Sequence, residues 1–229
     1  MGAGVAVLRS LTAVAVATVS SFVPAYATSG VAAPDRAGSE FTLGGLSPNV
    51  FEMAMGAASC AVRSGDVGQP DTLTVIDYSR PSTEKRLWVF DLRSRRLLYQ
   101  ELVAHGQGSG ENMAITFSNE TDSHRSSLGL FVTGDPYVGK NGYSLRLDGL
   151  DDGINDRARE RGIVMHGASY VSADFARLHG RLGRSWGCPA LREAVARDVI
   201  DRVKGGGLLF VYYPDPEWLE SSKYLACEK

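Results

Sequence analysis

The sequence lacks any apolar run long enough to cross a membrane. Its longest such run, residues 11–23, contains only Ala, Val, Leu, Phe, Thr and Ser, and it is shorter than the roughly 20 residues that a transmembrane helix needs. Arg9 precedes the run, and Pro24-Ala25-Tyr26-Ala27 follows it with the small-x-small pattern of a cleavage site. We therefore expect residues 1–27 to be a signal peptide. The mature chain would then start near Thr28, exported to the periplasm or another extracytoplasmic part of the cell envelope, with no stable membrane anchor.

An excess of charge of either sign is also missing. The 24 Lys and Arg residues are balanced by 26 Asp and Glu residues, and the two signs are interspersed along the chain. The sequence therefore predicts no broad basic surface, which argues against nucleic acid or anionic lipid as a partner. Ligand binding is expected at a local site.

Cysteine is scarce, with Cys60, Cys188 and Cys227 as its three positions. No closely spaced pair of metal ligands accompanies them, so we expect no metal and no cofactor. In an oxidising compartment two cysteines tend to pair, and Cys60 with Cys227 is then the expected bridge, because Cys188 lies in a dense motif. A buried Cys60 with a free thiol near the C-terminus is an equally consistent alternative.

Short β-branched and aromatic runs separated by turn residues predict a mainly β domain with accessory helices. Residues 28–45 are rich in Ala, Gly, Ser and Thr and predict a linker, and residues 46–229 predict one domain. One helix is expected from Ser47-Pro48 to Gly65, and a second from Pro189 to the glycines at 205–207. The predicted strands are 72–78, 87–92, 97–104, 113–118, 128–133, 143–147, 163–165 and 208–213, and an exposed helical turn is expected at 155–161.

The residues that carry chemistry lie between positions 165 and 193. A thiol with an ordinary pKa of about 8.5 is mostly protonated at pH 7, so its attack on a peptide carbonyl requires a base or a positive environment. His166, at the end of a β-like run, is the predicted base. Cys188 is the predicted nucleophile, and the expected helix at Pro189 would lower its pKa through the positive helix end. The amides of Gly187 and Cys188 are the predicted donors to the oxyanion of the tetrahedral intermediate.

This arrangement resembles the murein L,D-transpeptidase catalytic domain family, whose signature is a His-Gly pair followed by Ser-x-Gly-Cys. His166-Gly167 and Ser185-Trp186-Gly187-Cys188 match that signature. The resemblance extends over residues 71–213 through the segments VIDYS, RLWVFDL, VAHGQGSG, FSNE, SSLGLFVTG, YSLRLDGL, NDRARERGIVMHG and GRSWGCPAL.

The resemblance implies an L,D-transpeptidase-like β-sandwich catalytic domain that acts on peptidoglycan stem peptides. It also implies that the backbone carbonyl of Gly167 orients the imidazole of His166. Two positions depart from the commoner pattern, because Trp186 replaces a frequent His and Ala190 replaces an Arg. Arg192 follows two residues later, and its binding of a substrate carboxylate is therefore left open.

Four further residues are candidate substrate contacts, each with an alternative. Arg184 is expected either to bind a carboxylate of the stem or to form a structural ion pair. Ser185 is expected to contact substrate or to hold the turn, and Trp186 to line the cleft or to pack under the loop. His105 lies in a glycine-rich stretch that reads first as a flexible loop, with an alternative role as base or lid residue. His124 and His179 are interpreted as exposed or satisfied polar residues.

Three functions are consistent with this pattern. The first is transpeptidation, in which Cys188 releases D-alanine from a tetrapeptide stem and the thioester is then attacked by an amine to give a 3-3 crosslink. The second is L,D-carboxypeptidase or endopeptidase activity, in which water attacks the same thioester. The third is a non-catalytic wall-binding module or a metal site that uses Cys188 with a histidine. We expect the first.

Overall fold

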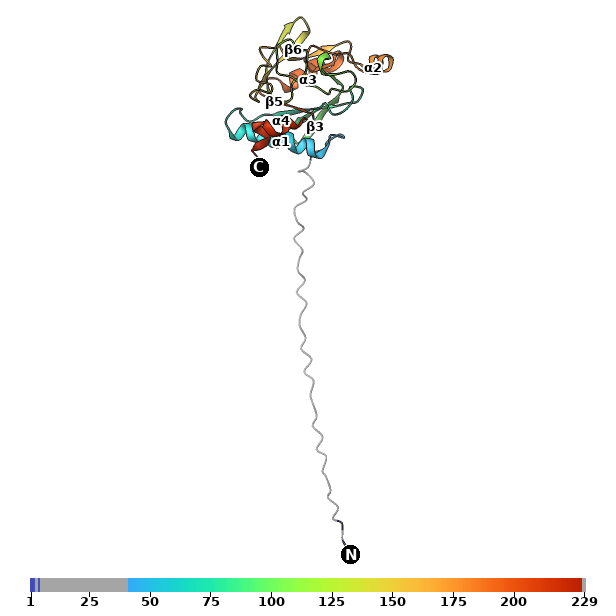
Figure 1. Cartoon of the computed structure of the whole chain (residues 1–229), viewed down its shortest axis with the longest axis vertical. Helices are drawn as coiled ribbons and strands as arrows, with labels where there is room; N and C mark the ends of the chain where they lie inside the picture. The colour runs from blue at the N-terminus through green and yellow to red at the C-terminus, as the bar shows by residue number, and fades with distance from the viewer. Residues whose placement is uncertain (3, 5–40, 228–229) are drawn as a thin grey trace. The chain divides into compact units, whose positions relative to one another are not determined.

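Within residues 41–227, nine strands form one hydrogen-bonded sheet in the computed structural model (Figure 1). The structure describes residues 1, 2, 4 and 41–227, so all but three residues of the predicted signal peptide lie outside the described part. The strand order is β3-β2-β1-β9-β5-β6-β7-β8-β4. The strands are β1 (Thr72–Asp77), β2 (Leu87–Asp91), β3 (Arg96–Glu101), β4 (Val103–Ala104), β5 (Gly129–Gly139), β6 (Gly142–Gly149), β7 (Val164–Ala168), β8 (Ala190–Arg192) and β9 (Leu208–Tyr212).

The sheet curls back toward itself. β3 and β4 stand at opposite ends of the strand order, yet Leu102 is the only residue between them in the chain. The two edges must therefore lie close together, which makes the sheet barrel-like. The pairs β1–β9 and β7–β8 are parallel, and the other pairs are antiparallel. The prediction of a mainly β domain with accessory helices is confirmed.

Strands β6 and β7 present one face to the core and the other to the candidate site. Leu145 pairs with Met165, and both are buried in the main hydrophobic cluster. Side chains alternate between the two faces of a strand, so Ser144, which pairs with His166, lies on the opposite face. The side chain of His166 is thereby directed away from this cluster.

Two helices cover strand β1, whose residues are all buried. Helix α1 (Pro48–Arg63) begins with Ser47 at the N-cap as predicted, and Gly65 with a φ of +78° follows its end. Its alanine-rich buried face contacts β1 and β9. Helix α3 (Glu193–Val203) contacts β1 and four more strands, and its buried residues are Ala196, Val199, Ile200 and Val203.

Four short helical segments were not predicted. They are the 3-10 turn η1 (Gln107–Ser109) and helices α2 (Ala173–His179), α4 (Pro216–Ser221) and α5 (Lys223–Ala226). Each has seven residues or fewer, too few for a helical hydrophobic period to be recognised in the sequence. Among the helices that the structure describes, none combines the length and the apolar character that crossing a membrane requires.

Three predicted boundaries were wrong. The second helix does not begin at Pro189, because Ala190–Arg192 form strand β8 between β7 and β4 and the helix begins at Glu193. Residues 113–118 form no strand, since Ala114 makes a single isolated bridge with Gly110. The predicted linker extended too far, because Phe41 and Leu43 pack against the core.

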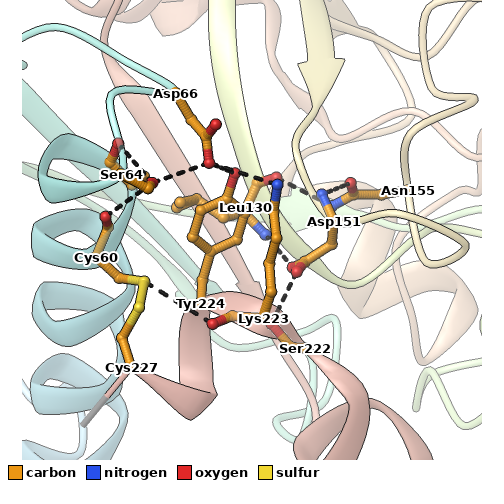
Figure 2. A network of polar contacts seen from close by, with 11 residues as sticks. Cys60, Ser64, Asp66, Leu130, Asp151, Asn155, Ser222, Lys223, Tyr224 and Cys227 are labelled. Carbon is orange, nitrogen blue, oxygen red and sulfur yellow. Dashed lines mark hydrogen bonds and ion pairs between the residues drawn. A yellow bond between two sulfur atoms is a disulfide. The ribbon is translucent and has the colours of Figure 1, made fainter.

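A disulfide joins Cys60 in α1 to Cys227 just after α5, with 5.9 Å between the two Cα atoms. This confirms the expected pairing and leaves Cys188 as the free cysteine of the described chain. Figure 2 shows side-chain hydrogen bonds that, like the disulfide, link the C-terminal residues 222–227 to earlier parts of the chain. The hydroxyl of Tyr224 donates to Asp66 at 2.7 Å, and that of Ser222 donates to the buried Asp151 at 2.8 Å.

We expect loss of this disulfide to destabilise the fold strongly. The bond closes a loop with a sequence separation of 167 residues, and removal of a native disulfide typically costs about 2 to 5 kcal/mol, at the upper end for long loops. Urea unfolding of the Cys60→Ser, Cys227→Ser double variant measures the loss. Reduction should bring the wild type to the same stability and leave the double variant unchanged; equal stability of oxidised and reduced wild type would contradict this expectation.

Candidate active site

The sulfur of Cys188 lies against the segment that leads into β7. The backbone N–H of Val164 donates to Sγ at 3.4 Å, and Sγ lies 3.7 Å from the carbonyl oxygen of Gly162, to which the thiol donates. The residue is 7% exposed. The thiol is therefore held by two backbone groups and largely shielded from bulk water.

His166 lies on β7, next to strand β8, which begins two residues after Cys188. It is paired with Ala190, and its backbone N–H donates to the carbonyl of Pro189 at 3.4 Å. The register of β7 and β8 therefore pairs two residues that are 24 positions apart in the sequence, His166 and Ala190. Burial leaves His166 5% exposed.

The imidazole of His166 is held in one tautomer. Its Nδ1 lies 2.9 Å from the carbonyl oxygen of Gly167, and because a carbonyl can only accept, Nδ1 carries the proton. Nε2 is then the unprotonated nitrogen. Burial lowers the pKa of His166, and the bond to Gly167 opposes this only in part. A neutral imidazole with a basic Nε2 is the form expected at neutral pH.

The pKa of Cys188 differs in direction from the prediction. Burial raises it, while the N–H of Val164 and the positive charge of Arg161 lower it to a smaller extent. The predicted contribution of a helix terminus is missing because α3 begins five residues after the cysteine. Burial thus favours the protonated thiol of Cys188 and the neutral imidazole of His166.

Gly187 occupies a conformation that few other residues adopt. Its φ is +115°, and a Cβ atom at this position would lie 2.8 Å from the carbonyl oxygen of Arg125 and 2.8 Å from Cδ1 of Ile163. Its backbone N–H donates to Oγ of Ser185 at 3.2 Å. In this structure the Gly187 amide is therefore hydrogen-bonded within the loop, and its role as an oxyanion donor stays a prediction.

Ser185 holds the loop that carries Cys188. Its Oγ donates to the carbonyl of Cys188 at 2.6 Å. Its backbone N–H donates to the carbonyl of His105 at 3.0 Å, and its own carbonyl accepts from Gln107 at 2.8 Å. Of the two predicted roles, the structure places Ser185 in the turn.

His105 is not part of a flexible loop. It is fully buried, its Nδ1 lies 2.7 Å from the guanidinium of Arg86, and its Nε2 lies 3.3 Å from the carbonyl of Gly110. Because Arg86 only donates, Nδ1 is the accepting nitrogen. Burial, together with the charge of Arg86, lowers the pKa of His105 to about 4. A substrate cannot reach this ring, so the predicted contact and lid roles are wrong.

The two arginines on either side of Cys188 in the sequence, Arg184 and Arg192, have protein partners. Arg184 forms an ion pair with Glu111 at 2.6 Å and donates to the carbonyl of Gly110. Arg192 makes a two-pronged ion pair with Glu101, at 2.8 and 2.7 Å. Of the two roles predicted for Arg184, the structure shows the ion pair.

Trp186, two residues before Cys188 in the sequence, lies at the surface. It is 71% exposed, and its ring stacks on that of His124 with 4.8 Å between centroids and 13° between planes. Nδ1 of His124 is in turn 3.1 Å from the side-chain amide of Gln107. The alternative in which Trp186 packs under the loop is wrong, because the side chain is exposed.

A sequence model of the L,D-transpeptidase catalytic domain matches residues 43–212 of this chain. The chain belongs to the L,D-transpeptidase catalytic domain family. No curated protein matches the chain.

Three solved structures illustrate the likeness. An L,D-transpeptidase from Mycobacterium smegmatis is 14% identical, with a TM-score of 0.40 over 62% of this chain and 59% of that chain. One from Stackebrandtia nassauensis is 13% identical, with a TM-score of 0.40 over 72% and 68%. A mutant of the helical cell shape determining protein Pgp2 from Campylobacter jejuni is 11% identical, with a TM-score of 0.41 over 70% and 56%. The chain thus spans about three fifths of the length of the first of these structures.

Arg161 is a residue of this L,D-transpeptidase domain that sequence reasoning missed. Its guanidinium donates to the carbonyls of Ser118 and Arg125, both at 2.7 Å, and to the hydroxyls of Ser127 and Ser123. It thereby fastens residues 118–127 beside Gly187, against which the carbonyl of Arg125 packs. The sequence shows Arg161 only as one charge in a polar turn, because its acceptors are more than 30 positions away.

Ser126 was also missed. Its Oγ accepts from the N–H of Gly106 at 3.0 Å and donates to the carbonyl of Gly187 at 3.1 Å, so it joins the loop of Gly106 to the loop that carries Cys188.

Within the described residues, no group of three or more His, Cys, Asp or Glu side chains is arranged to hold a metal ion.

Proposed function

We propose that this L,D-transpeptidase domain performs acyl transfer on tetrapeptide stems of peptidoglycan, with Cys188 as nucleophile and His166 as base. The supporting observation is the fixed Sγ of Cys188 on one strand connection and, on the neighbouring strand, an imidazole whose Nδ1 is bound to Gly167. An unprotonated Nε2 next to a protonated thiol is what general-base activation requires.

The reaction follows from these protonation states. Nε2 of His166 takes the thiol proton as Sγ bonds to the carbonyl carbon of the diamino acid at the third position of the stem. The tetrahedral intermediate collapses, the peptide bond breaks, and the imidazolium protonates the departing amine of D-alanine. An amine of a second stem then attacks the thioester, His166 takes its proton, and Cys188 leaves and is reprotonated. The product is a 3-3 crosslink.

Trp186 is proposed to line the approach of the stem, because its ring is exposed beside the nucleophile. Gly187 and Ser185 are proposed to hold the loop at the required curvature rather than to bind substrate. The disulfide between Cys60 and Cys227 supports an extracytoplasmic location, since disulfides persist mainly in oxidising compartments.

Product analysis tests this proposal. Incubation of the purified chain with disaccharide-tetrapeptide should release D-alanine and yield crosslinked dimers, which mass spectrometry identifies. Trimmed tripeptide stems without dimers would instead indicate hydrolysis of the same thioester, the activity of an L,D-carboxypeptidase. Cys188→Ala should abolish both products, and equal D-alanine release by the variant and the wild type would reject the proposal.

A further inference from the structure

Arg146 lies on the same face of the sheet as His166. In the register of β6 and β7, Arg146 pairs with Val164 and Ser144 pairs with His166, and the two pairs are two residues apart. Cross-strand partners point to the same side of a sheet, and so do residues two positions apart. The side chain of Arg146 therefore emerges on the site face, one strand away from the segment that holds the sulfur.

A hollow of 200 Å³ adjoins this segment. Seven residues line it: Tyr137, Arg146, Leu147, Arg159, Gly162, Ile163 and Val164. Gly162 and Val164 are also the two residues whose backbone groups contact Sγ of Cys188. The hollow thus shares a wall with the nucleophile.

The guanidinium of Arg146 has no anionic partner among the residues that the structure describes. Its one interaction there is with the ring of Tyr137, whose centroid lies 4.3 Å from Cζ. Neighbouring arginines are occupied, since Arg159 is paired with Asp148 and Arg161 donates to four protein oxygens. Stacking on the ring of Tyr137 holds the guanidinium of Arg146 in place and leaves the N–H donors of the guanidinium available for a ligand.

An arginine in this state fits one kind of ligand. A guanidinium presents a planar fork of N–H donors that matches a carboxylate in two-pronged geometry. Stacking on an aromatic ring fixes the plane of the fork in advance, which lowers the entropy cost of binding. A peptide carboxylate in the hollow would therefore accept hydrogen bonds from the guanidinium of Arg146.

We infer that Arg146 binds the free C-terminal carboxylate of the acyl-donor stem, an inference that rests on the proposed function. In a tetrapeptide donor this carboxylate belongs to the D-alanine that leaves, one residue beyond the scissile carbonyl. Successive Cα atoms are about 3.8 Å apart, and Arg146 stands one strand from Val164, whose N–H contacts the sulfur. The spacing places that carboxylate within reach of the long arginine side chain. Arg146 would thus select donors that end one residue after the bond to be cleaved.

Paired substrates test this inference. Two tetrapeptide donors are compared, one with a free C-terminal carboxylate and one with a C-terminal amide. The wild type should prefer the carboxylate by about 10- to 100-fold in kcat/KM, the range of a hydrogen-bonded charged contact. The Arg146→Gln variant should lose this preference, because its kcat/KM should fall for the carboxylate donor and stay unchanged for the amide donor. Iodoacetamide should alkylate Cys188 of this variant at the wild-type rate.

Arg197→Gln is the matched control. Arg197 also stacks on a tyrosine of β6, with 4.2 Å between its Cζ and the centroid of Tyr143, but from helix α3, and Tyr143 alternates with Ser144 to the opposite face of the sheet. This variant should keep the full preference. If the wild type turns over both donors equally, or if Arg146→Gln keeps the preference, the inference is wrong although the proposed function stands. If the wild type turns over neither donor, the proposed function itself fails.

Discussion

Replacing His166 with alanine should slow the acylation of Cys188 by about 100- to 10,000-fold at pH 7, the usual contribution of a positioned general base. The thiol starts protonated, because burial raises its pKa, and Nε2 of His166 is the basic nitrogen that the hydrogen bond to Gly167 leaves available. Stopped-flow measurement of D-alanine release, or of the single-turnover thioester, gives the rate. His124→Ala, which removes the ring beneath Trp186, is a control that should retain the chemical step.

The pH dependence of the same rate follows from the two pKa directions. The pKa of His166 is lowered by burial, so the wild-type rate should hold as pH falls through about 6.5, the ordinary histidine value, and decline only below it. The residual rate of His166→Ala should instead rise with pH as the thiolate forms, because no base remains to take its proton. A variant that keeps both the wild-type rate and the wild-type pH profile would exclude His166 as the base.

Gly187→Ala should remove nearly all activity and also destabilise the protein. A positive φ costs a residue with a side chain about 1 to 3 kcal/mol, and an added methyl in a packed site costs about 1 to 3 kcal/mol more. The methyl would meet the carbonyl oxygen of Arg125 at 2.8 Å, and this backbone group is held in place by Arg161. Relief of the contact must therefore shift the loop that carries Cys188.

The Gly205→Ala variant separates the cost of a positive φ from the cost of the steric contact. Gly205 has a φ of +75°, but a Cβ atom there would meet nothing within 4 Å. This control should lose the conformational part of the stability and retain activity. Urea unfolding and D-alanine release measure both quantities, and an active Gly187→Ala protein of wild-type stability would contradict the steric account of this position.

The sequence allowed a good prediction of the local pattern and a poorer one of long-range contacts. Alternating or continuous apolar runs with turn residues between them identified strands such as β1 and β9, because strand burial leaves a local signature. Residues 190–192 were wrongly predicted as the start of a helix, because so short a segment suits a helix and a strand equally. The pairing of β8 with β7, which the sequence does not show, makes this segment a strand. For the cysteines, the sequence predicted Cys60 with Cys227 if any two paired and left open whether they pair; the structure shows that they do.

Residues whose roles depend on distant partners could not be predicted. His105 sits among glycines and resembles a loop residue, yet Arg86, 19 positions earlier, fixes its ring in the interior. From the sequence, Ser185 was a candidate substrate contact or turn residue, and the Gly187 amide was a candidate oxyanion donor. In the structure the N–H of Gly187 donates to the hydroxyl of Ser185, so both groups are hydrogen-bonded within the loop. Arg146 was not predicted as a site residue, because only the register of β6 and β7 shows that its side chain lies on the same face of the sheet as that of His166.

Trapping the covalent intermediate tests the central claim most directly. The chain is mixed with a tetrapeptide donor whose side-chain amine on the third residue is acetylated, so that no acceptor amine is present, quenched in acid, and examined by intact mass and by peptide mapping. The proposed mechanism predicts a single adduct with the mass of the stem less D-alanine, attached to the sulfur of Cys188 and removed by hydroxylamine. Release of D-alanine by a Cys188→Ala protein, or an acyl group attached to any other residue, would contradict it.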